Sequence, residues 1–550
     1  MTPPIASPLI RMRNITLGAA VIAAVIAAQY PGLGWLWYAG LFVLGVLALT
    51  LDLPTAIKGY CLTLSLQVGQ PFGLFRLAVA DIFMVPALIR TVFEAKQRGE
   101  RLPASTLNRP FALLLLVLAI GLVIGGLTAG RLSGYVLFNR VAGVAVLLAA
   151  FFVLARYVTS VAIAVRLARW FVVATGVANL AALAIAGAAF IGIDPGTVYL
   201  VASLRLNGWV GNPSLYGSVL IAASLLELGM LGAAARPGDG RWWRWTNVWL
   251  MGLGIAMTVS RSTWLAGGAG AGALLLLIVA TAPRLWLARV PHKLVVATWM
   301  LLPAAVLGSI LVVSMRAGIE TVDDRVAALQ QMAQAQAMTE PAGMPSLAGS
   351  SAPVASPPPG AAAGVNTPTT AAEPTPTIAP PQPPVPAGVT AGSLQTALTP
   401  EGSVMNSRGL TDRAAIQLVA WERYRKDLPS TVFGIGLGTF LNESAATFGY
   451  SLIIHNTFLW FLVELGPLGL IAVLWIWWRT ARNLWTAAAA SDGRRYLAHG
   501  AFGALGALTV FCLVNEAFYQ RHLWFVLMLA DRMALLPPDA AGDLDEGPVL

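Results

Sequence analysis

Charged residues are scarce in this chain: they make up 11% of its 550 residues, while hydrophobic residues make up 57%. Soluble domains carry about 25% charged residues, so this composition excludes an ordinary soluble domain and predicts a polytopic membrane protein. The net charge of +10 does not indicate nucleic-acid binding, because no basic stripe with interleaved aromatic residues occurs. We expect most of this charge in loops that set the membrane orientation.

Cysteines and clustered acidic residues are also rare. The two cysteines, Cys61 and Cys512, lie in apolar segments, where we expect packed core residues rather than a disulfide or a thiolate metal cluster. No Asp-x-Asp motif occurs on the predicted outer face, where Asp323-Asp324 is the one acidic pair. The sequence therefore predicts no cofactor and no metal requirement, with arginines supplying the positive charge that a metal would supply.

Long apolar segments fill most of the chain. With the N-terminus inside, each predicted cytoplasmic connection is basic except the very short turn at Asp52, as the positive-inside rule requires. The segment 54–69 is short and carries Lys58 and Gln67, so we expect it to be re-entrant or interfacial. The sequence predicts an all-α polytopic membrane protein with about 12–14 transmembrane helices and both termini in the cytoplasm. The apolar segments are 14–30, 35–51, 54–69, 77–93, 110–128, 135–156, 162–191, 213–234, 245–259, 262–281, 292–314, 453–480, 495–516 and 519–536.

Three regions follow from this pattern. Residues 1–199 hold N-terminal transmembrane helices, residues 200–480 form a central region, and residues 481–550 hold C-terminal transmembrane helices and an acidic cytoplasmic tail. The central region includes one large outer loop, 315–450, in which 341–400 holds 15 of the chain's 35 prolines and a single charged residue. Such a segment cannot bury enough apolar surface to fold, so we expect a disordered Pro/Ala-rich insertion without chemistry.

The end of the outer loop predicts a surface helix. Residues Thr411–Leu428 begin with a threonine that suits an N-cap, and their apolar residues lie among basic ones that include Arg413. This composition suits a helix lying on the outer leaflet, with Trp421 and Tyr424 at the level of the headgroups. The following turn, Gly434–Gly438, has the glycine spacing of a phosphate loop, but no Lys-Ser/Thr follows and no βαβ pattern surrounds it, so we reject that function.

The stretch His455–Gly466 opens a long apolar helix directly after the outer loop. The predicted topology leaves His455 and His522 as the histidines of the outer face, and a neutral imidazole acts as a general base near pH 7. His455 is the better candidate for chemistry; the alternative is an interfacial residue without chemistry. Glu464 lies about 13 Å deeper in the same helix, where an ionisable group costs about 3 kcal/mol or more unless it is paired or faces a wet cavity.

Two polar turns precede membrane helices on the same predicted face. Residues Arg205–Ser214 form a glycine-rich turn in which Pro213 suits the first helical turn. Residues Ser260–Leu265 join two apolar segments with almost no loop, which fixes the guanidinium of Arg261 at the membrane surface. The other ionisable residues predicted on this face include Glu516, Arg521 and, with nothing around it to suggest a site, Arg140.

These motifs resemble those of the O-antigen ligase and O-antigen polymerase family of bacterial inner-membrane glycosyltransferases. Arg261–Leu265 is similar to the family's Arg-x3-Leu pattern, and His455–Gly466 is similar to its His-x10-Gly pattern, including the His-Asn pair. Arg205 with Gly211-Asn212-Pro213 resembles the family's glycine-asparagine-proline turn, although Ser214 stands where many members have a second Asn.

The resemblance covers roughly residues 200–480 and identifies this region as an O-antigen ligase-like core. It implies a type-C glycosyltransferase whose active face lies on the periplasmic side of the bacterial inner membrane and whose donor is a polyprenyl-diphosphate-linked glycan. It implies catalytic roles for His455, Arg261 and Arg205, since a diphosphate needs paired guanidinium donors and an acceptor hydroxyl needs a base. The residues expected to bind substrate are Arg413, Asn212, Asn456, Glu464 and Arg521.

The acceptor stays open at this point. An O-antigen ligase transfers to lipid A-core, a polymerase transfers to another lipid-linked repeat, and a protein O-oligosaccharyltransferase is a third alternative. We expect donor, acceptor and membrane lipids as partners, and no nucleic acid. The rival from another class is a transporter or flippase of lipid-linked saccharide, which favours inverted repeats and charges near the bilayer midplane. No repeat is found in the sequence and its notable charges gather at one predicted surface, which favours an enzyme.

Overall fold

The computed structural model describes residues 16–23, 34–66, 71–72, 75–76, 78–99, 103–129, 136–190, 206–210, 212–233, 242–281, 405–448 and 453–537. Contacts divide the chain into two compact units, Met1–Met315 with Gly392–Leu550 and Arg316–Ala391. Every described residue belongs to the first unit. The predicted segment 292–314 and the Pro-rich insertion 341–400 lie outside the described residues, and the predicted boundaries after residues 199 and 480 remain predictions.

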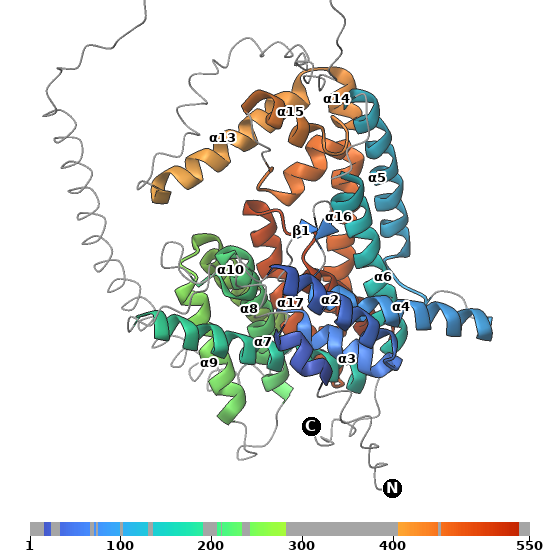
Figure 1. The fold of residues 1–550 in the computed structure, drawn as a ribbon, viewed down its shortest axis with the longest axis vertical. Helices are drawn as coiled ribbons and strands as arrows, with labels where there is room; N and C mark the ends of the chain where they lie inside the picture. The colour runs from blue at the N-terminus through green and yellow to red at the C-terminus, as the bar shows by residue number, and fades with distance from the viewer. Residues whose placement is uncertain are drawn as a thin grey trace, which may run out of the picture. The chain divides into compact units, whose positions relative to one another are not determined.

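The described part of the chain is helical apart from one hairpin of two very short strands (Figure 1). Strand β1 (Pro71–Phe72) pairs antiparallel with β2 (Phe75–Arg76). A helix at 16–23 comes first. The other elements are α2 (Gly34–Leu49), α3 (Leu53–Thr63), α4 (Val79–Arg98), α5 (Asn108–Ala129), the π-helix η2 (Val136–Val141), α6 (Ala142–Tyr157), α7 (Val161–Phe190), the 3-10 helix η3 (Gly208–Val210), α8 (Pro213–Ala233), α9 (Trp242–Met257), α10 (Arg261–Thr281), α13 (Met405–Arg425), α14 (Leu428–Phe433), α15 (Thr439–Phe448), α16 (Thr457–Ala489), α17 (Arg494–Val514) and α18 (Arg521–Leu535).

Six of the described helices are long and apolar enough to cross a membrane, which makes the chain an all-α polytopic membrane protein. They belong to α5, α7, α8, α10, α16 and α17. Helix α3 has 11 residues, a length of about 16 Å, and is too short for a hydrocarbon core of about 30 Å. This length agrees with the expectation that 54–69 does not span, while the total of 12–14 membrane helices remains a prediction.

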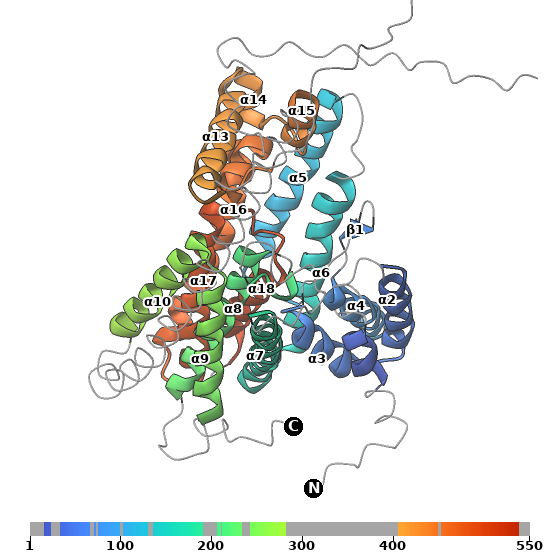
Figure 2. The ribbon, with the colours of Figure 1, turned by 60° about the vertical axis from the view of Figure 1, so that its left-hand side comes forward.

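Helix α17 packs tightly between α8 and α10, and Figures 1 and 2 show the three helices side by side. A Cβ atom on Gly229 of α8 would lie 2.5 Å from the backbone nitrogen of Gly500 in α17. A Cβ atom on Gly270 of α10 would lie 2.8 Å from the carbonyl oxygen of Gly503. Small residues let helix backbones approach in a membrane, where dispersion and not hydrophobic expulsion drives association. The end of α8 meets the start of α17, and Thr281, the last residue of α10, contacts His499 near the start of α17, so both neighbours run antiparallel to α17.

Ion pairs join helices that are far apart in the sequence. The Arg521 guanidinium at the start of α18 donates from Nε to Oδ1 of Asp81 in α4 over 2.7 Å. Asp81 also accepts a hydrogen bond from the backbone nitrogen of Ala78 over 2.9 Å, which caps the start of α4. Arg244 of α9 forms a second buried ion pair with Glu227 of α8. Removing one partner of such a pair costs about 3–5 kcal/mol, because the other charge is left buried and unpaired.

The outer helix differs from its prediction at its start. Helix α13 begins at Met405, before Thr411, so Thr411 lies inside the helix and is not its N-cap. Tyr424 is buried, and its hydroxyl donates to the carbonyl oxygen of Thr431 over 2.8 Å. Residues of α14 therefore cover Tyr424, while its predicted level among the headgroups remains a prediction. Trp421 is exposed.

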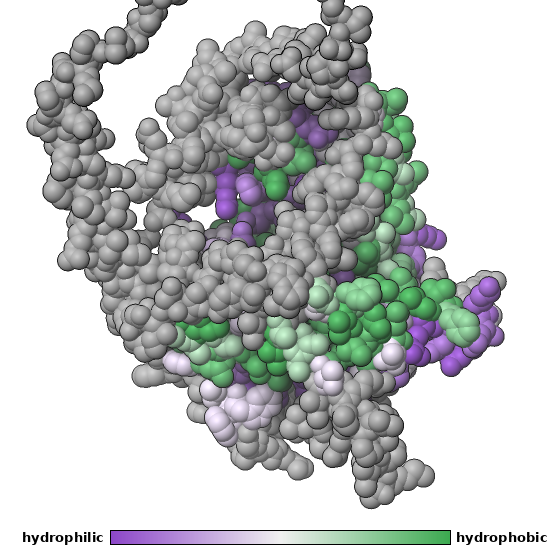
Figure 3. Space-filling view, viewed as in Figure 1, coloured by the Kyte–Doolittle hydropathy of each residue, from purple (hydrophilic) through white to green (hydrophobic). Residues whose placement is uncertain are grey.

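The flanks of α4 and α5 present apolar side chains outward. Val123 and Leu127 of α5 and Phe93 of α4 are exposed, and Figure 3 shows these helices as green, hydrophobic surface along one side of the molecule. The same picture shows hydrophilic atoms at the end of α4, whose last turn carries Lys96 and Arg98. An exposed apolar flank bounded by charge is what a lipid-facing surface requires.

Candidate functional site

The starts of α8, α10, α16 and α18 lie at one end of the helix bundle, where α17 ends. The antiparallel packing brings the starts of α8 and α10 to this end, because Thr281, the last residue of α10, contacts His499 near the start of α17 with Oγ1 and Nε2 3.0 Å apart. The Thr457 hydroxyl at the start of α16 donates to the Asn515 carbonyl just after α17 over 2.9 Å. His522 of α18 bonds Ser218 of α8 over 3.1 Å. Four helix N-termini, each a partial positive charge, therefore share this end.

His455 lies immediately before α16 at this end and is half-buried. Its backbone carbonyl accepts a hydrogen bond from Nε2 of Gln417 in α13 over 3.2 Å, which ties the outer helix to the start of α16. Burial, and then the positive charge of Arg413, lower the pKa of His455 below its usual 6.5. The imidazole is therefore neutral near pH 7, the form that accepts a proton.

Arg413 of α13 reaches the end of α17. Its Nη1 donates to the carbonyl oxygen of Val514 over 3.4 Å. This contact brings the guanidinium close enough to His455 to act on its pKa. The sequence predicted both residues for the site, which stays a prediction; the structure links α13 to the His455 carbonyl through Gln417 and to the Val514 carbonyl through Arg413.

Asn456, the neighbour of His455, has a clear local role. Its side chain accepts a hydrogen bond from the backbone nitrogen of Leu459 over 3.0 Å, so Asn456 is the N-cap of α16. Asn212 does the same for α8, where its side chain accepts from the backbone nitrogens of Ser214 (3.0 Å) and Leu215 (3.1 Å). Both asparagines were predicted to bind substrate; the structure shows them ordering the helix starts at this end.

A cluster of hydroxyls joins the two polar turns. Ser214 and Ser260 lie 2.9 Å apart through their Oγ atoms, and Ser260 lies 2.9 Å from the Oγ of Ser262. Ser214 thus takes a specific partner at the position where the sequence differs from the resembled family. Arg261, the first residue of α10, stands between Ser260 and Ser262, and its side chain is exposed. Within the described residues it forms no ion pair, while Arg205 lies outside them.

Glu464 sits where α16 is interrupted. Gly466 has a left-handed φ of 71° and Pro467 has no N–H, so the helix is kinked there. The Glu464 carboxylate is buried and accepts hydrogen bonds from the backbone nitrogen of Gly438 (2.9 Å) and the indole of Trp460 (2.8 Å). Its described partners are thus protein groups, which fits the expectation that a carboxylate at this depth is paired.

The glycine turn 434–438 fills the kink in α16. The backbone nitrogens of Ile435 and Gly436 donate to the carbonyls of Val463 (2.9 Å) and Glu464 (3.1 Å), which the kink leaves without helical partners. Leu437 donates in turn to Gly121 of α5 over 2.7 Å. Gly436 has a φ of 94°, a conformation that glycine adopts without strain. These bonds occupy the amides that a phosphate loop would present.

Two predicted outer residues have other roles. Arg521 is paired with Asp81, as described above, so its guanidinium is held within the helix bundle. His522 is completely buried against Ser218, which removes it from chemistry on the outer surface. Burial of this kind depends on the packing of α18, which sequence periodicity does not reveal.

The sequence around Arg140 does not indicate a site, yet Arg140 pairs with Glu516 in the structure. Its Nη2 donates to Oε2 of Glu516 over 3.1 Å. The guanidinium also lies over the rings of Trp460 (4.8 Å) and Tyr519 (5.1 Å). The signal in the sequence that could have indicated this pair is one basic and one acidic residue beside apolar segments. Each of these ionisable residues needs a partner there.

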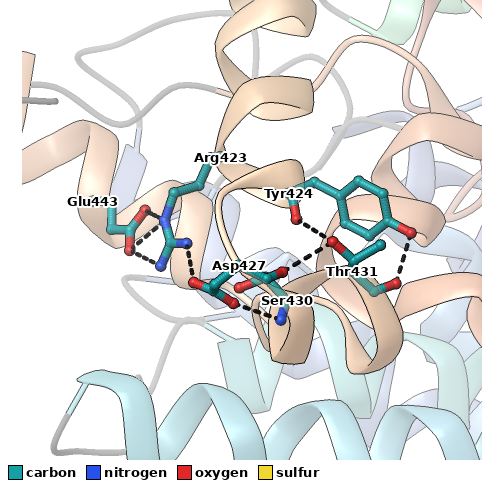
Figure 4. A network of polar contacts seen from close by, with 6 residues as sticks. All are labelled: Arg423, Tyr424, Asp427, Ser430, Thr431 and Glu443. Carbon is teal, nitrogen blue, oxygen red and sulfur yellow. Dashed lines mark hydrogen bonds and ion pairs between the residues drawn. The ribbon is translucent and has the colours of Figure 1, made fainter. Parts of the chain in front are cut away.

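The outer helices α13, α14 and α15 are joined by a polar network (Figure 4). Arg423 donates from Nε to Glu443 Oε2 (2.9 Å) and from Nη2 to Oε1 (3.0 Å), a two-point contact between α13 and α15. Asp427 accepts from the backbone nitrogen of Ser430 over 2.8 Å and so caps α14. This network joins α13, the helix that carries Arg413 and Gln417, to α14 and α15.

Searches of protein-family models, curated proteins and solved structures found no match to this chain. The fold and composition define its class as an all-α membrane protein with several membrane-spanning helices. In the described part of the chain no group of three or more His, Cys, Asp or Glu residues is arranged to hold a metal ion. The expected independence from metals remains a prediction.

Proposed function

We propose that the protein is a membrane glycosyltransferase that moves an oligo- or polysaccharide from a polyprenyl-diphosphate carrier to an acceptor hydroxyl. The observation that carries the proposal is the half-buried imidazole of His455 at the start of a membrane helix, whose pKa is lowered by burial and then by the positive charge of Arg413. Arg261 begins another membrane helix at the same end. A proton acceptor next to guanidinium groups suits a reaction in which a hydroxyl attacks and a diphosphate leaves.

In this mechanism His455 takes the proton of the acceptor hydroxyl as the oxygen attacks the anomeric carbon. The bond between that carbon and the diphosphate oxygen breaks, and the lipid diphosphate leaves with both electrons of the bond. Arg261 and Arg413, with Arg205, neutralise the negative charge that develops on the leaving group. The exposed position of Arg261 suits contact with a substrate that arrives from the membrane.

We infer a type-C arrangement with 12–14 membrane helices, an active face on the periplasmic side of a bacterial inner membrane, and cytoplasmic termini. The acceptor is lipid A-core or a lipid-linked glycan, as for an O-antigen ligase or polymerase. Basic residues in the predicted inner connections support this orientation.

Transfer by purified variants tests the proposed roles. With lipid-linked donor and acceptor, His455→Ala is expected to lower turnover by about 10²–10⁴-fold while donor binding survives. Arg261→Ala is expected to weaken donor binding as well as turnover, and Arg261→Lys to restore it partly, because an ammonium lacks the paired donors. Arg109→Ala removes another exposed arginine near the start of a membrane helix, α5, and serves as the matched control. Unchanged turnover per folded molecule in His455→Ala would overturn the mechanism.

Two further measurements address metal use and the acceptor. Transfer is expected to continue in excess EDTA; loss of activity that Mg²⁺ or Mn²⁺ restores would contradict the arginine-based mechanism. In a deletion strain, single repeats attached to lipid A indicate a polymerase, and full-length polymer left on the lipid carrier indicates a ligase. Lipid-linked saccharide retained on the cytoplasmic face would instead indicate a flippase.

A further inference from the structure

The short segment from Val514, the last residue of α17, to Ala517 bonds three other parts of the chain, namely α13, α16 and η2. The Val514 carbonyl accepts from Arg413 of α13 over 3.4 Å. The Asn515 carbonyl accepts from the hydroxyl of Thr457 in α16 over 2.9 Å, and the Ala517 nitrogen donates back to the same hydroxyl over 3.0 Å. Four consecutive residues thus hold both the helix that carries Arg413 and the helix that follows His455.

Thr457 is completely buried, two residues after His455. Its hydroxyl donates to the Asn515 carbonyl and accepts from the Ala517 nitrogen, so two backbone groups fix its position. Two other buried threonines of the described membrane helices, Thr175 and Thr480, instead donate to the carbonyl four residues earlier in their own helix, each over 2.7 Å. This pair of long-range hydrogen bonds constrains where α16 starts, whereas a hydrogen bond within the helix does not.

Glu516 lies between the two backbone contacts and is held by Arg140 of η2 over 3.1 Å. Arg140 in turn lies 4.8 Å from the ring of Trp460, whose indole donates to Glu464. The 514–517 segment is therefore braced against the first turn of α16 on one side and against η2 on the other. Because each of its residues forms such a contact, the segment has little freedom to move relative to the groups that it joins.

We propose that Thr457 and Glu516 are positioning residues: through the 514–517 segment they fix the His455 imidazole relative to the Arg413 guanidinium. This inference rests on the proposed function for its catalytic meaning, but the linkage is testable without any transfer reaction. Neither residue touches the substrate in this account. Their contribution is geometric, and a displacement of about 1 Å between reacting groups costs on the order of 10²-fold in rate.

The test replaces the Thr457 hydroxyl in the full chain in detergent. Thr457→Val keeps the shape and removes both hydrogen bonds, Thr457→Ser keeps the hydroxyl, and Thr480→Val removes a buried hydroxyl from the same helix as the matched control. Histidine-selective NMR titration reports the pKa of His455, assigned by the resonance lost in His455→Gln. Thr457→Val is expected to raise this pKa toward 6.5, because the imidazole moves away from both its buried surroundings and Arg413. Thr457→Ser and Thr480→Val are expected to leave it at the wild-type value.

Transfer kinetics give the second readout. Thr457→Val is expected to lower kcat by about 10–100-fold with little change in KM for the lipid-linked donor, and Thr457→Ser to restore most of it. A His455 pKa that stays unmoved in Thr457→Val, or that moves equally in Thr480→Val, overturns the inference. If Thr457→Val does not fold, Glu516→Gln, which keeps the side-chain volume, replaces it in both measurements. The same changes in the pKa of His455 and in kcat are then expected. If Thr457→Val shifts the pKa of His455 but the wild-type protein shows no transfer activity, the proposed function is refuted. The positioning of His455 by the 514–517 segment then still stands.

Discussion

The bundle of α8, α10 and α17 and the outer helices α13, α14 and α15 are held together by opposite means. In the bundle, glycines such as Gly229 and Gly500 bring backbones into direct contact. In the outer helices, the contacts are the Arg423–Glu443 ion pair, the Asp427 cap and the Tyr424 hydroxyl. The first region depends on the volume of its side chains, and the second depends on charge and hydrogen bonding.

This difference follows from the solvent that each region faces. Apolar helices in lipid gain little from burying more apolar surface, so close packing of small residues decides their association. The outer helices carry charged residues that water and salt can reach, and their contacts weaken when charge is removed or screened. The proposed site draws on both regions, since α13 carries Arg413, whose Nη1 donates to the Val514 carbonyl at the end of α17, and α10 begins with Arg261. Each region is therefore expected to fail under a different perturbation.

The largest effect is expected from Gly229→Ala in α8. The added Cβ would lie 2.5 Å from a backbone nitrogen of α17, where no flexible side chain can move aside. Overpacking of this kind costs about 1–3 kcal/mol, and we expect a lower thermal midpoint in detergent. Gly272→Ala in α10 is the control, because nothing lies within 4 Å of its added Cβ. That variant is expected to be neutral or more stable by up to about 1 kcal/mol, since Ala is the better helix former. Equal behaviour of the two variants would contradict the close packing.

A smaller effect is expected from Asp427→Ala in the outer helices. Loss of an N-cap costs about 0.5–2 kcal/mol, and we expect faster hydrogen exchange in α14 with little change in α17. Asp427→Asn keeps the cap and is expected to behave like the wild type. Exchange that increases equally in the bundle would show that the two regions unfold together.

The pH dependence of this cap has a defined sign. Hydrogen bonds from Ser430 lower the pKa of Asp427. Because the folded-state pKa lies below the unfolded value of about 3.9, the contribution of the carboxylate is present above that value and is lost as the pH falls through the lowered folded pKa. Protection of α14 in Asp427→Asn is expected to lack this acid step.

The smallest effect is expected from Glu443→Gln. The Arg423–Glu443 pair is partly exposed, and such pairs contribute about 0–1 kcal/mol. We expect a small loss of stability in the outer helices at low salt, and no difference from the wild type near 1 M salt, where the Debye length is about 3 Å. Gly229→Ala is expected to keep its full effect at both salt concentrations. A salt-independent Glu443→Gln effect would show that packing, not charge, holds α13 to α15.

The helices themselves were predictable because the signal is local. The apolar segment 162–191 matches α7 (Val161–Phe190), and 262–281 matches α10 (Arg261–Thr281). Arg261 at a helix start and His455 just before another were read directly from the boundary between polar and apolar residues. Lone ionisable residues in apolar segments, such as Glu464, were also expected to be paired, because an unpaired charge is too costly there.

The partners of those residues were decided only by the tertiary structure. Arg521 was expected to meet substrate, but it binds Asp81 from the other end of the chain. The sequence did not predict that Arg140 and Glu516 pair, although they form one ion pair beside the start of α16. Helical periodicity fixes which residues share a face of one helix, whereas the choice of partner depends on how antiparallel helices are ordered and rotated around α17. That arrangement is set by the close approach of small residues summed over several helices, and no short motif encodes it.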